Sequence, residues 1–202
     1  STFTLRVAHV ETRQYRAFPW SQRARAAANG IACALPAHAA PRSIDLSKPP
    51  SEATRQSIIG AGAVRVGATI VSPDQCDAFG RMRGEHFVGR VSDSVPNLLA
   101  DWRRETAADA GSGPPAGAVV EARLVFRNFP RAGELIEVHS GLIEVGEKTN
   151  RLVHWIVDPE TGTTWASMEV VALTFDTLTR KTIAPSAEAR ARMQKRIVKL
   201  AV

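Results

Sequence analysis

Hydrophobic and polar positions follow two rhythms along this chain, and the clearer pattern lies after residue 63. Five stretches there are rich in β-branched and apolar residues and are bounded by loops and turns, which predicts strands. Short turn sequences join the last four in near-continuous order, so we expect an antiparallel meander. The predicted strands are residues 64–71, 119–126, 135–145, 149–157 and 163–175.

A second rhythm appears between the first strand and the meander. Apolar residues recur every three or four positions over residues 85–102, which predicts an amphipathic helix. Pro96 lies inside this segment, and we expect it to kink or split the helix because proline lacks a backbone N–H. The order of strand, long helix and meander predicts an α+β fold in which one sheet face covers the helix.

The flanking segments are simpler. Residues 3–10 alternate as a strand does, and residues 21–29 read as a short helix with Ser21 as its N-cap. Residues 33–56 are rich in proline and alanine and suit a linker. Residues 187–200 predict a basic helix. We therefore expect an N-terminal extension, residues 1–60, and a domain, residues 61–202, that ends in the basic helix.

Composition narrows the class of protein. The net charge is +6, and much of the excess lies near the C-terminus, but no aromatic platform or groove-reading motif accompanies it, so we expect no nucleic-acid partner. No apolar run approaches the length of a membrane span. Cys33 and Cys76 form no CxxC pair, so a disulfide framework or a metal site is not expected, and a reducing, cytoplasmic setting fits best.

The residues most suited to chemistry lie between the first strand and the helix. Residues 74–87 hold three carboxylates, a histidine and two arginines, with glycines at 80 and 84 that allow tight turns and close approach to a ligand. His139 and His154 fall on predicted strands, where a lone histidine is usually a surface or packed residue. Cys76 and Ser94 lack the neighbours that an activated nucleophile needs.

The run Asp77-Ala78-Phe79-Gly80-Arg81-Met82, with an aromatic residue at Phe87, resembles the Asp-x-x-Gly-His-Met signature of 4-hydroxybenzoyl-CoA-thioesterase-like hotdog proteins. The later run Phe129-Pro130-x-x-Gly133-Glu134, followed by a long strand, looks like the second half of that family. The resemblance covers residues 64–181. It implies a hotdog fold, in which a five- to six-stranded antiparallel sheet wraps a long central helix.

The resemblance also implies roles for individual residues. Asp77 aligns with the carboxylate that attacks the thioester carbonyl or activates water. The amides of Gly84 and Glu85 would polarise the carbonyl oxygen at the helix N-terminus. Further roles are contact with the substrate for Gly80, Arg81, Met82 and Phe87, and binding of the coenzyme A phosphates for Arg83 and Arg90. No metal or organic cofactor is expected beyond the coenzyme A moiety of the substrate.

Other roles remain open for the same carboxylates. Asp77 would also suit a cap of the turn around Phe79–Met82, and Glu85 would also stabilise the helix dipole. Asp93 is a second catalytic candidate, because some hotdog enzymes take the acting carboxylate from the central helix. His86 follows Glu85 directly, and adjacent helical residues point apart.

Three functions compete. The first is a thioesterase that acts on acyl-CoA or on acyl carrier protein. The second is a non-catalytic binder of acyl-CoA, which the departures from the family favour, since Arg81 replaces its histidine and Arg83-Gly84 its asparagine pair. The third is a hydratase or dehydratase, which would need a histidine beside the carboxylate. In each case we expect a small-molecule partner and a homodimer or higher homo-oligomer, because pairing protects exposed sheet edges.

Short sequence motifs near the N-terminus recur near the C-terminus and form a weak internal repeat. Thr12-Arg13 recurs as Thr179-Arg180, and Arg23-Ala24-Arg25 recurs at the same spacing as Arg190-Ala191-Arg192. Each occurrence precedes or opens a basic, alanine-rich helix. One interpretation is that residues 1–30 are the tail of a first hotdog unit, with a strand at residues 3–16 paired to a sheet. Chance similarity in an Ala- and Arg-rich chain is the other.

Overall fold

The computed structural model of the chain describes residues 9–11, 16–34, 36–45, 47, 53–106 and 114–199. Two compact units are present, Ser1–Arg42 and Ser43–Val202. The division into an N-terminal extension and a domain at residues 60 and 61 stays a prediction.

The described residues of the first unit form four short elements. These are β1 (His9–Glu11), β2 (Arg16–Phe18), α1 (Gln22–Gly30) and the 3-10 turn η1 (Ala37–Ala39). Ser21 caps α1 as predicted, because its hydroxyl accepts a hydrogen bond from the Ala24 amide at 3.1 Å. The strand expected at residues 3–16 lies partly outside the described residues. Within them the chain forms two short strands that pair with each other, and the proposed tail of a first hotdog unit stays a prediction.

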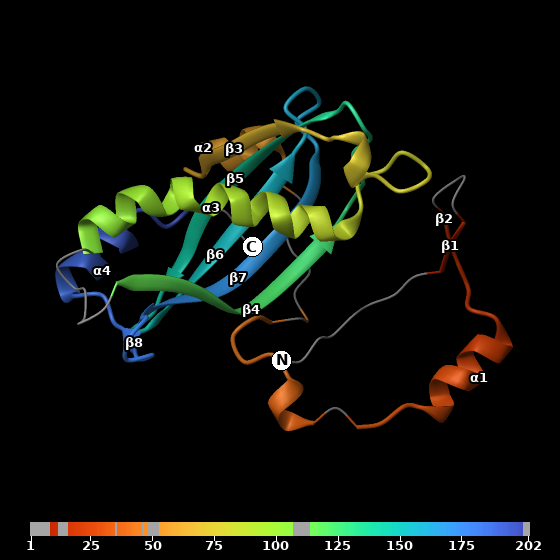
Figure 1. The fold of residues 1–202 in the computed structure, drawn as a ribbon, viewed down its shortest axis with the longest axis horizontal. Coiled ribbons are helices and arrows are strands. Elements are labelled where there is room, and N and C mark those ends of the chain that lie inside the picture. The colour runs from red at the N-terminus through yellow and green to blue at the C-terminus, as the bar shows by residue number, and fades with distance from the viewer. Residues whose placement is uncertain are drawn as a thin grey trace. The chain divides into compact units, whose positions relative to one another are not determined.

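The second unit is built on a six-stranded antiparallel sheet (Figure 1). Its order is β3-β5-β6-β7-β4, with the short β8 paired to β7. The α+β architecture is therefore confirmed, and β5 and β6 begin and end at the predicted residues. The predicted four-strand meander is wrong in one respect: β5, β6 and β7 are consecutive neighbours, but β4 pairs with β7 and not with β5, because the loop after β4 crosses to the β3 side of the sheet. The strands are β3 (Val64–Ile70), β4 (Pro115–Phe126), β5 (Leu135–Val145), β6 (Thr149–Val157), β7 (Thr164–Asp176) and β8 (Thr182–Ile183).

The central helix α3 (Gly84–Thr106) runs without a break past Pro96. A split at this proline was a wrong prediction, and the packing explains why. Val91 and Leu98 are both buried against the sheet on either side of it, and the Asn97 side chain donates a 2.7 Å hydrogen bond to the Val66 carbonyl of β3. Proline removes one helical N–H, the donor to the Ser92 carbonyl, and these contacts offset that loss.

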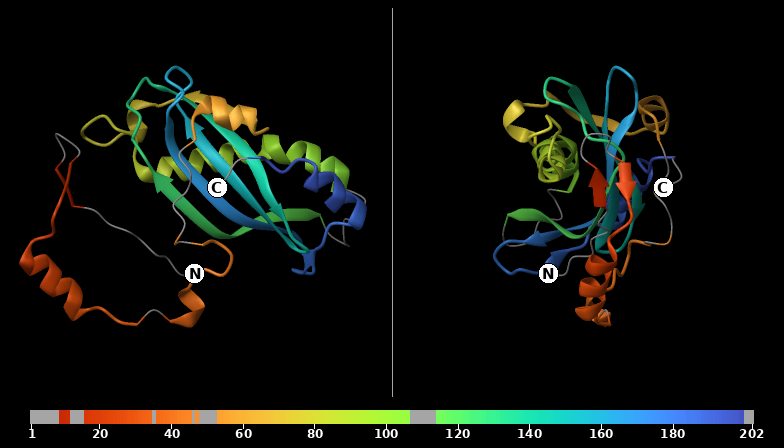
Figure 2. Two further views of the ribbon diagram at one scale, coloured as in Figure 1. Left: turned by 180° about the vertical axis from the view of Figure 1, so that it is seen from behind. Right: turned by 90° about the vertical axis from the view of Figure 1, so that its right-hand side faces the viewer.

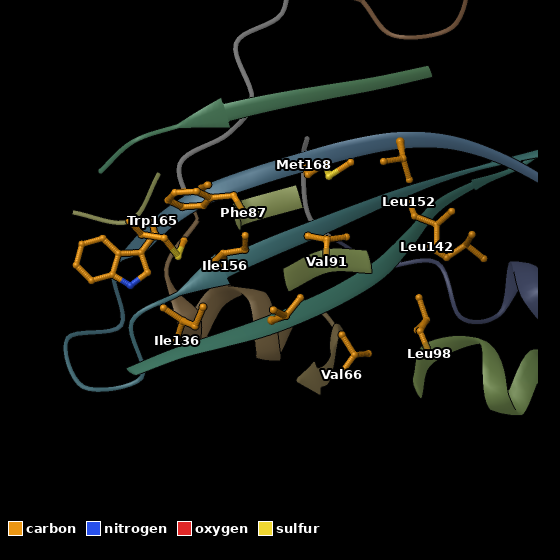
Figure 3. Packing of buried hydrophobic residues seen from close by; sticks show 14 of the residues in the cluster. Val66, Phe87, Val91, Leu98, Ile136, Leu142, Leu152, Ile156, Trp165 and Met168 are labelled. Atoms are coloured by element: carbon orange, nitrogen blue, oxygen red, sulfur yellow. The ribbon is translucent and has the colours of Figure 1, made fainter. Parts of the chain in front are cut away.

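Between α3 and the sheet lies the main hydrophobic core (Figure 3). Phe87 is fully buried at the start of the helix, edge-on to Phe126 at 5.1 Å and to Phe129 at 5.7 Å between ring centroids. These contacts fix the helix start against the end of β4. The strand residues beneath α3 include Ile136, Leu142, Leu152, Ile156, Met168 and Val170.

The opposite face of the sheet is also covered. A short helix, α2 (Arg55–Gly60), lies there, on the other side of the sheet from α3 (Figure 2). Its Ile58 is fully buried in a cluster with Trp155 and Val153 of β6. The Glu137 carboxylate of β5 fastens this helix to the sheet by accepting from Arg55 at 2.7 Å. The bond with Arg55, more than any other contact, holds the pKa of Glu137 at about 2.

The C-terminal helix α4 (Ala187–Gln194) ends earlier than predicted. Helix up to residue 200 was wrong because the chain leaves α4 to bond to β5. Ile197 forms a parallel bridge with Leu142, and the Val198 amide donates to the Leu142 carbonyl at 2.8 Å. Val198 packs where Gly141 has no side chain, since a Cβ there would lie 2.4 Å from a methyl of Val198.

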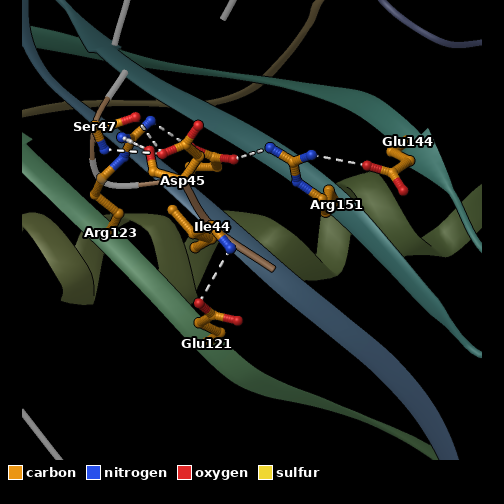
Figure 4. Close-up of polar contacts among 8 residues, drawn as sticks. Ile44, Asp45, Ser47, Glu121, Arg123, Glu144 and Arg151 are labelled. Atoms are coloured by element: carbon orange, nitrogen blue, oxygen red, sulfur yellow. Dashed lines mark hydrogen bonds and ion pairs between the residues drawn. The ribbon is translucent and has the colours of Figure 1, made fainter. Parts of the chain in front are cut away.

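Charged contacts continue across the outer face toward β4 (Figure 4). The Glu121 carboxylate accepts hydrogen bonds from the backbone amides of Ser43 and Ile44 at 3.0 and 3.1 Å. Arg123 donates to the Asp45 carbonyl at 2.9 Å and to Glu169 at 2.6 Å. The segment before α2 is therefore held against β4. Within the described part of the chain, no helix combines the length and apolar character that crossing a bilayer requires.

Candidate functional site

The loop that carries the Asp77 motif is a closed turn. It follows β3 through the 3-10 turn η2 (Pro73–Gln75), and Cys76 then pairs with Met82 in an antiparallel bridge. Inside that bridge the Asp77 amide donates to the Arg81 carbonyl at 2.8 Å. Gly80 has a φ of 74°, a conformation that favours glycine. The glycine of the motif therefore serves the turn.

Asp77 itself is exposed, and its Oδ1 atom accepts two backbone hydrogen bonds. The donors are the amides of Phe79 at 2.8 Å and Arg81 at 3.1 Å. This is the turn-capping geometry that the sequence left open as an alternative to catalysis. The two bonds fix the direction of the carboxylate, which is compatible with either role.

The second half of the motif is joined to the loop after β4. The Gly80 carbonyl accepts from the Ala132 amide at 3.2 Å, and Met82 donates to the Pro130 carbonyl at 2.8 Å. Between these two bonds the backbones of Arg81 and Arg131 form an isolated antiparallel β-bridge. The two runs that carried the family resemblance are thus adjacent. Met82 is fully buried, as Phe87 is, so both side chains support the loop and the helix start from within the core.

Gly84 begins α3 and presents its amide at the helix N-terminus. Among the described residues no hydrogen-bond acceptor is recorded for this amide. A side chain at this position would lie 3.2 Å from the Phe126 ring, so glycine lets β4 approach closely. The next residue, Glu85, has its pKa lowered, first by its own backbone amide and then by Arg83. Gly84 is therefore the better placed of the two amides for an oxyanion.

Arg83 and Arg90 connect the loop to the helix. Arg83 donates to Glu85 at 2.7 Å and to the Cys76 carbonyl at 3.4 Å, and one of its nitrogens lies 2.9 Å from His86 Nε2. Arg90 donates to the side-chain oxygen of Gln75 at 2.5 Å. A phosphate would have to share these guanidinium groups with the loop, so their proposed role in coenzyme A binding stays a prediction.

A cavity of about 340 Å³ lies between the second half of α3 and the sheet. Exposed residues such as Ser92, Pro96 and Val119 form its rim, whereas Leu152 and Val170 form an apolar, buried floor. The remaining lining residues come from α3, β4, β6, β7, β8, α4 and the turns beside them and include Val95, Leu99, Ala118, Ala172, Ile183, Met193, and Lys148 of the turn before β6. The volume is in the range of small-molecule sites.

None of the three predicted catalytic carboxylates lines this cavity. Ser92, the lining residue nearest the helix start, follows Gly84 by about 12 Å along the helix axis, at 1.5 Å per residue. Asp93 is exposed, and one residue turns a helix by about 100°, which directs it away from the side that Ser92 occupies. The motif loop and the cavity therefore lie along the same helix, about two turns apart.

The floor of the cavity also holds His154, which the sequence predicted to be a surface or packed strand residue and which the structure shows to be packed. His154 is 2% exposed, and its Nδ1 lies 2.7 Å from the Ser140 hydroxyl on the neighbouring strand. Burial lowers the pKa of His154 to about 4, so the imidazole is neutral at physiological pH. His154 lies two positions from both Leu152 and Ile156 on the same strand, so the three side chains share one face. This spacing was the sequence signal that would have placed His154 on the inner face of the sheet.

No cluster of three or more histidine, cysteine or carboxylate side chains that would hold a metal ion occurs among the residues that the structure describes. The charged and polar groups near the motif are of three kinds. They are carboxylates, an open helix-start amide and arginines.

Comparison with known proteins gives the family and the fold of the chain. The profile of the Thioesterase-like superfamily matches residues 71–195, which include the motif loop, α3 and the meander. No protein with a curated function matches the sequence.

Solved structures support the same fold. The probable thioesterase YbaW of Escherichia coli is 17% identical, with a TM-score of 0.56 over 65% of this chain and 97% of its own. The SAV2348 protein of Staphylococcus aureus, solved in complex with CoA, is 15% identical, with a TM-score of 0.57 over 69% of this chain and 90% of its own. The 12:0-ACP thioesterase of Umbellularia californica is 12% identical, with a TM-score of 0.57 over 69% of this chain and 55% of its own. These similarities confirm the hotdog fold, and the match of the family profile shows that the chain belongs to the Thioesterase-like superfamily.

Proposed function

We propose that the protein hydrolyses thioesters of coenzyme A or of acyl carrier protein and holds the acyl group in the cavity beneath α3. The superfamily supports the reaction class, and the structural neighbour with bound CoA supports the leaving group. The observation that carries the proposal is the apolar cavity of about 340 Å³, which opens beside the same helix whose N-terminus presents the Gly84 amide.

The chemistry needs few groups. In one form of the proposed reaction the Asp77 carboxylate attacks the thioester carbonyl, the thiolate leaves, and water then hydrolyses the acyl anhydride on Asp77 to the free acid. In the other form Asp77 takes a proton from the water that attacks the carbonyl, and the thiolate leaves with the free acid as the second product. The Gly84 amide would stabilise the oxyanion, aided by the helix dipole. Arg83 and Arg90 would meet the phosphates of coenzyme A at the loop. Such a reaction requires no metal or organic cofactor.

A second copy of the chain would complete the site. β4 is an edge strand of twelve residues, and no described strand pairs with its outer edge. Val119 and Val120, which are 55% and 58% exposed, lie at a bulge in this strand. Long apolar edges invite pairing. We therefore expect a homodimer joined along β4, next to the rim of the cavity.

The dimer has a direct test. Val120 is the unpaired residue of the bulge, so Val120→Lys should leave the fold intact and place a charge at the edge. Light scattering coupled to size-exclusion chromatography should report a dimer for the wild type and a monomer for the variant. A monomeric wild type would contradict the shared site.

One observation favours a non-catalytic binder of acyl-CoA. Both hydrogen bonds of Asp77 Oδ1 serve the turn, which gives this residue a structural function without any chemistry. Arg81 and Arg83 also replace residues that the family signature holds. Such a protein would bind the thioester and leave it intact.

A pair of variants separates the two functions. Asn retains a side-chain oxygen that can accept the two turn amides, so Asp77→Asn removes the negative charge and keeps the cap. Asp77→Ala removes both. Thiol release would be followed over a panel of acyl-CoA and acyl carrier protein thioesters, and thermal unfolding would be measured beside it.

For an enzyme we expect Asp77→Asn to lose at least about 100-fold in turnover with an unchanged melting temperature, the scale that general-base catalysis supplies. Asp77→Ala should lose activity and stability together. If the wild type releases no thiol from any thioester that it binds, the binder is correct. If Asp77→Asn turns over normally, Asp77 is only a cap.

A further inference from the structure

The floor of the cavity contains a polar pair in apolar surroundings. His154 on β6 and Ser140 on β5 face each other in register, and both are at least 98% buried, at 2% and 1% exposure. The residues two positions away from His154 on either side, Leu152 and Ile156, belong to the hydrophobic core. Ser140 and His154 are therefore two polar side chains surrounded by apolar ones, and each of their hydrogen-bond donors and acceptors needs a partner.

The direction of the hydrogen bond within the pair follows from this requirement. The Ser140 hydroxyl lies 2.7 Å from Nδ1 of His154, and no other partner is recorded for it among the described residues. A buried hydroxyl hydrogen needs an acceptor, and the neutral imidazole offers one nitrogen that accepts. Ser140 therefore donates to Nδ1, and the imidazole proton resides on Nε2.

Nε2–H is then a donor beside the cavity, on a side chain that is 2% exposed. Among the described residues no acceptor is recorded for it, and His154 is one of the residues that line the cavity. A single water is a poor partner, because an ordered water needs two to four polar contacts. The nearest polar lining residue on the same strand is Asn150, four residues and about 13 Å away at the rise of a strand.

We propose that the cavity recognises an acyl group that carries a hydroxyl or keto oxygen, and that His154 is the residue that selects it by donating from Nε2 to that oxygen. This inference rests on the proposed thioesterase function and names its substrate class. Leu152 and Val170 enclose the hydrocarbon part of the chain. A plain saturated chain would fill the same space and leave the donor unpaired.

The position of the oxygen follows from the helix. Ser92 at the near end of the cavity lies about 12 Å beyond Gly84, where the thioester carbonyl would sit. An oxygen next to the carbonyl would remain at the helix start. On β6 the cavity begins at His154, two residues or about 7 Å along the strand from Ile156, whose row in the sheet ends at Phe126 beneath the helix start. The recognised oxygen is therefore several carbons beyond the thioester.

Binding of free acids tests this inference apart from turnover. Calorimetry would compare decanoate, β-hydroxydecanoate and ω-hydroxydecanoate with the full chain, and nitrogen NMR would follow the His154 imidazole. We expect ω-hydroxydecanoate to bind at least about 10-fold more tightly than decanoate, the scale of one buried donor left unpaired or satisfied. We also expect it to shift the Nε2 signal, whereas β-hydroxydecanoate should resemble decanoate.

Two variants assign the effect. His154→Leu should reduce the ratio of the two affinities to about one while decanoate still binds, and Ser140→Ala with His154→Leu replaces it if the single variant does not fold. His38→Leu, at an exposed histidine of η1 that does not line the cavity, is the matched control and should keep the wild-type ratio. Equal affinity of the wild type for ω-hydroxydecanoate and decanoate would overturn the inference. So would a preference that survives loss of the imidazole.

Measured together, binding of the free acids and thiol release from the CoA thioesters test the recognition by His154 and the thioesterase function separately. Selective binding of ω-hydroxydecanoate without thiol release from ω-hydroxydecanoyl-CoA would reject the thioesterase and keep the recognition by His154. Thiol release at equal rates from decanoyl-CoA and ω-hydroxydecanoyl-CoA, with equal binding of the two acids, would keep the thioesterase and reject the recognition.

Discussion

The buried histidine makes the stability of this protein sensitive to mild acid. The pKa of His154 is lowered from 6.5 to about 4 by burial, so the unfolded chain takes up a proton at a higher pH than the folded one does. Between these two pKa values the unfolded state binds more protons, and stability therefore falls as the pH falls. From pH 7 to pH 5 the linkage amounts to about 2 kcal/mol, and it approaches about 3 kcal/mol at pH 4.

The measurement is a comparison of two proteins at two pH values. In the double variant Ser140→Ala, His154→Leu both partners of the hydrogen bond become apolar, which leaves no orphaned group. Thermal unfolding should show the wild type losing about 4–8 °C more than the double variant between pH 7 and pH 5. The carboxylates with lowered pKa values, including Glu137, act at lower pH and are common to both proteins. Parallel losses in the two proteins would refute the assignment of this transition to His154.

Three further changes probe the packing and the ion pairs. Phe87→Ala should cost about 3–5 kcal/mol in urea unfolding because Phe87 is fully buried, whereas Phe79→Ala, at a residue 50% exposed, should stay within about 0.5 kcal/mol; equal losses would contradict the core assignment. The pKa of Glu137, about 2 against an ordinary 4.5, means that the wild type loses stability as the pH falls from 4.5 toward 2. Glu137→Gln should be less stable at pH 7 and should lack that acid-dependent loss in a series of urea titrations. Gly141→Ala should cost about 1–3 kcal/mol, because its Cβ would lie 2.4 Å from Val198, and Val198→Ala should restore part of the melting temperature.

The parts of the fold that the sequence predicted are those with a strong local period. The bounds of β5 and β6 agreed to the residue, since alternation, β-branched content and turn residues all pointed the same way. The six-residue helix at Arg55–Gly60, which begins at the end of the proline-rich stretch, was missed. Its stability depends on burying Ile58 against Trp155, a contact between distant segments that no local pattern contains.

The site was predicted unevenly for the same reason. The motif around Asp77 could be found because its residues are contiguous, and even its alternative role as a turn cap was visible. The cavity could not be found, because its floor and rim come from six elements that only the sheet order brings together. His154 is the clearest case, since its meaning depends on Ser140, its partner on the neighbouring strand.

The backbone bond between the Lys199 amide and the Ala61 carbonyl, at 3.1 Å, has a consequence for biosynthesis. It joins the segment after α4 to the segment before β3. Both segments are therefore needed to cover Trp155 and exclude water from it. During translation this cover cannot form until almost the whole described chain has left the ribosome. Until then the back of the sheet stays open, and contacts so distant in sequence are slow to form. The nascent chain should therefore depend on chaperones for longer than its size alone would require.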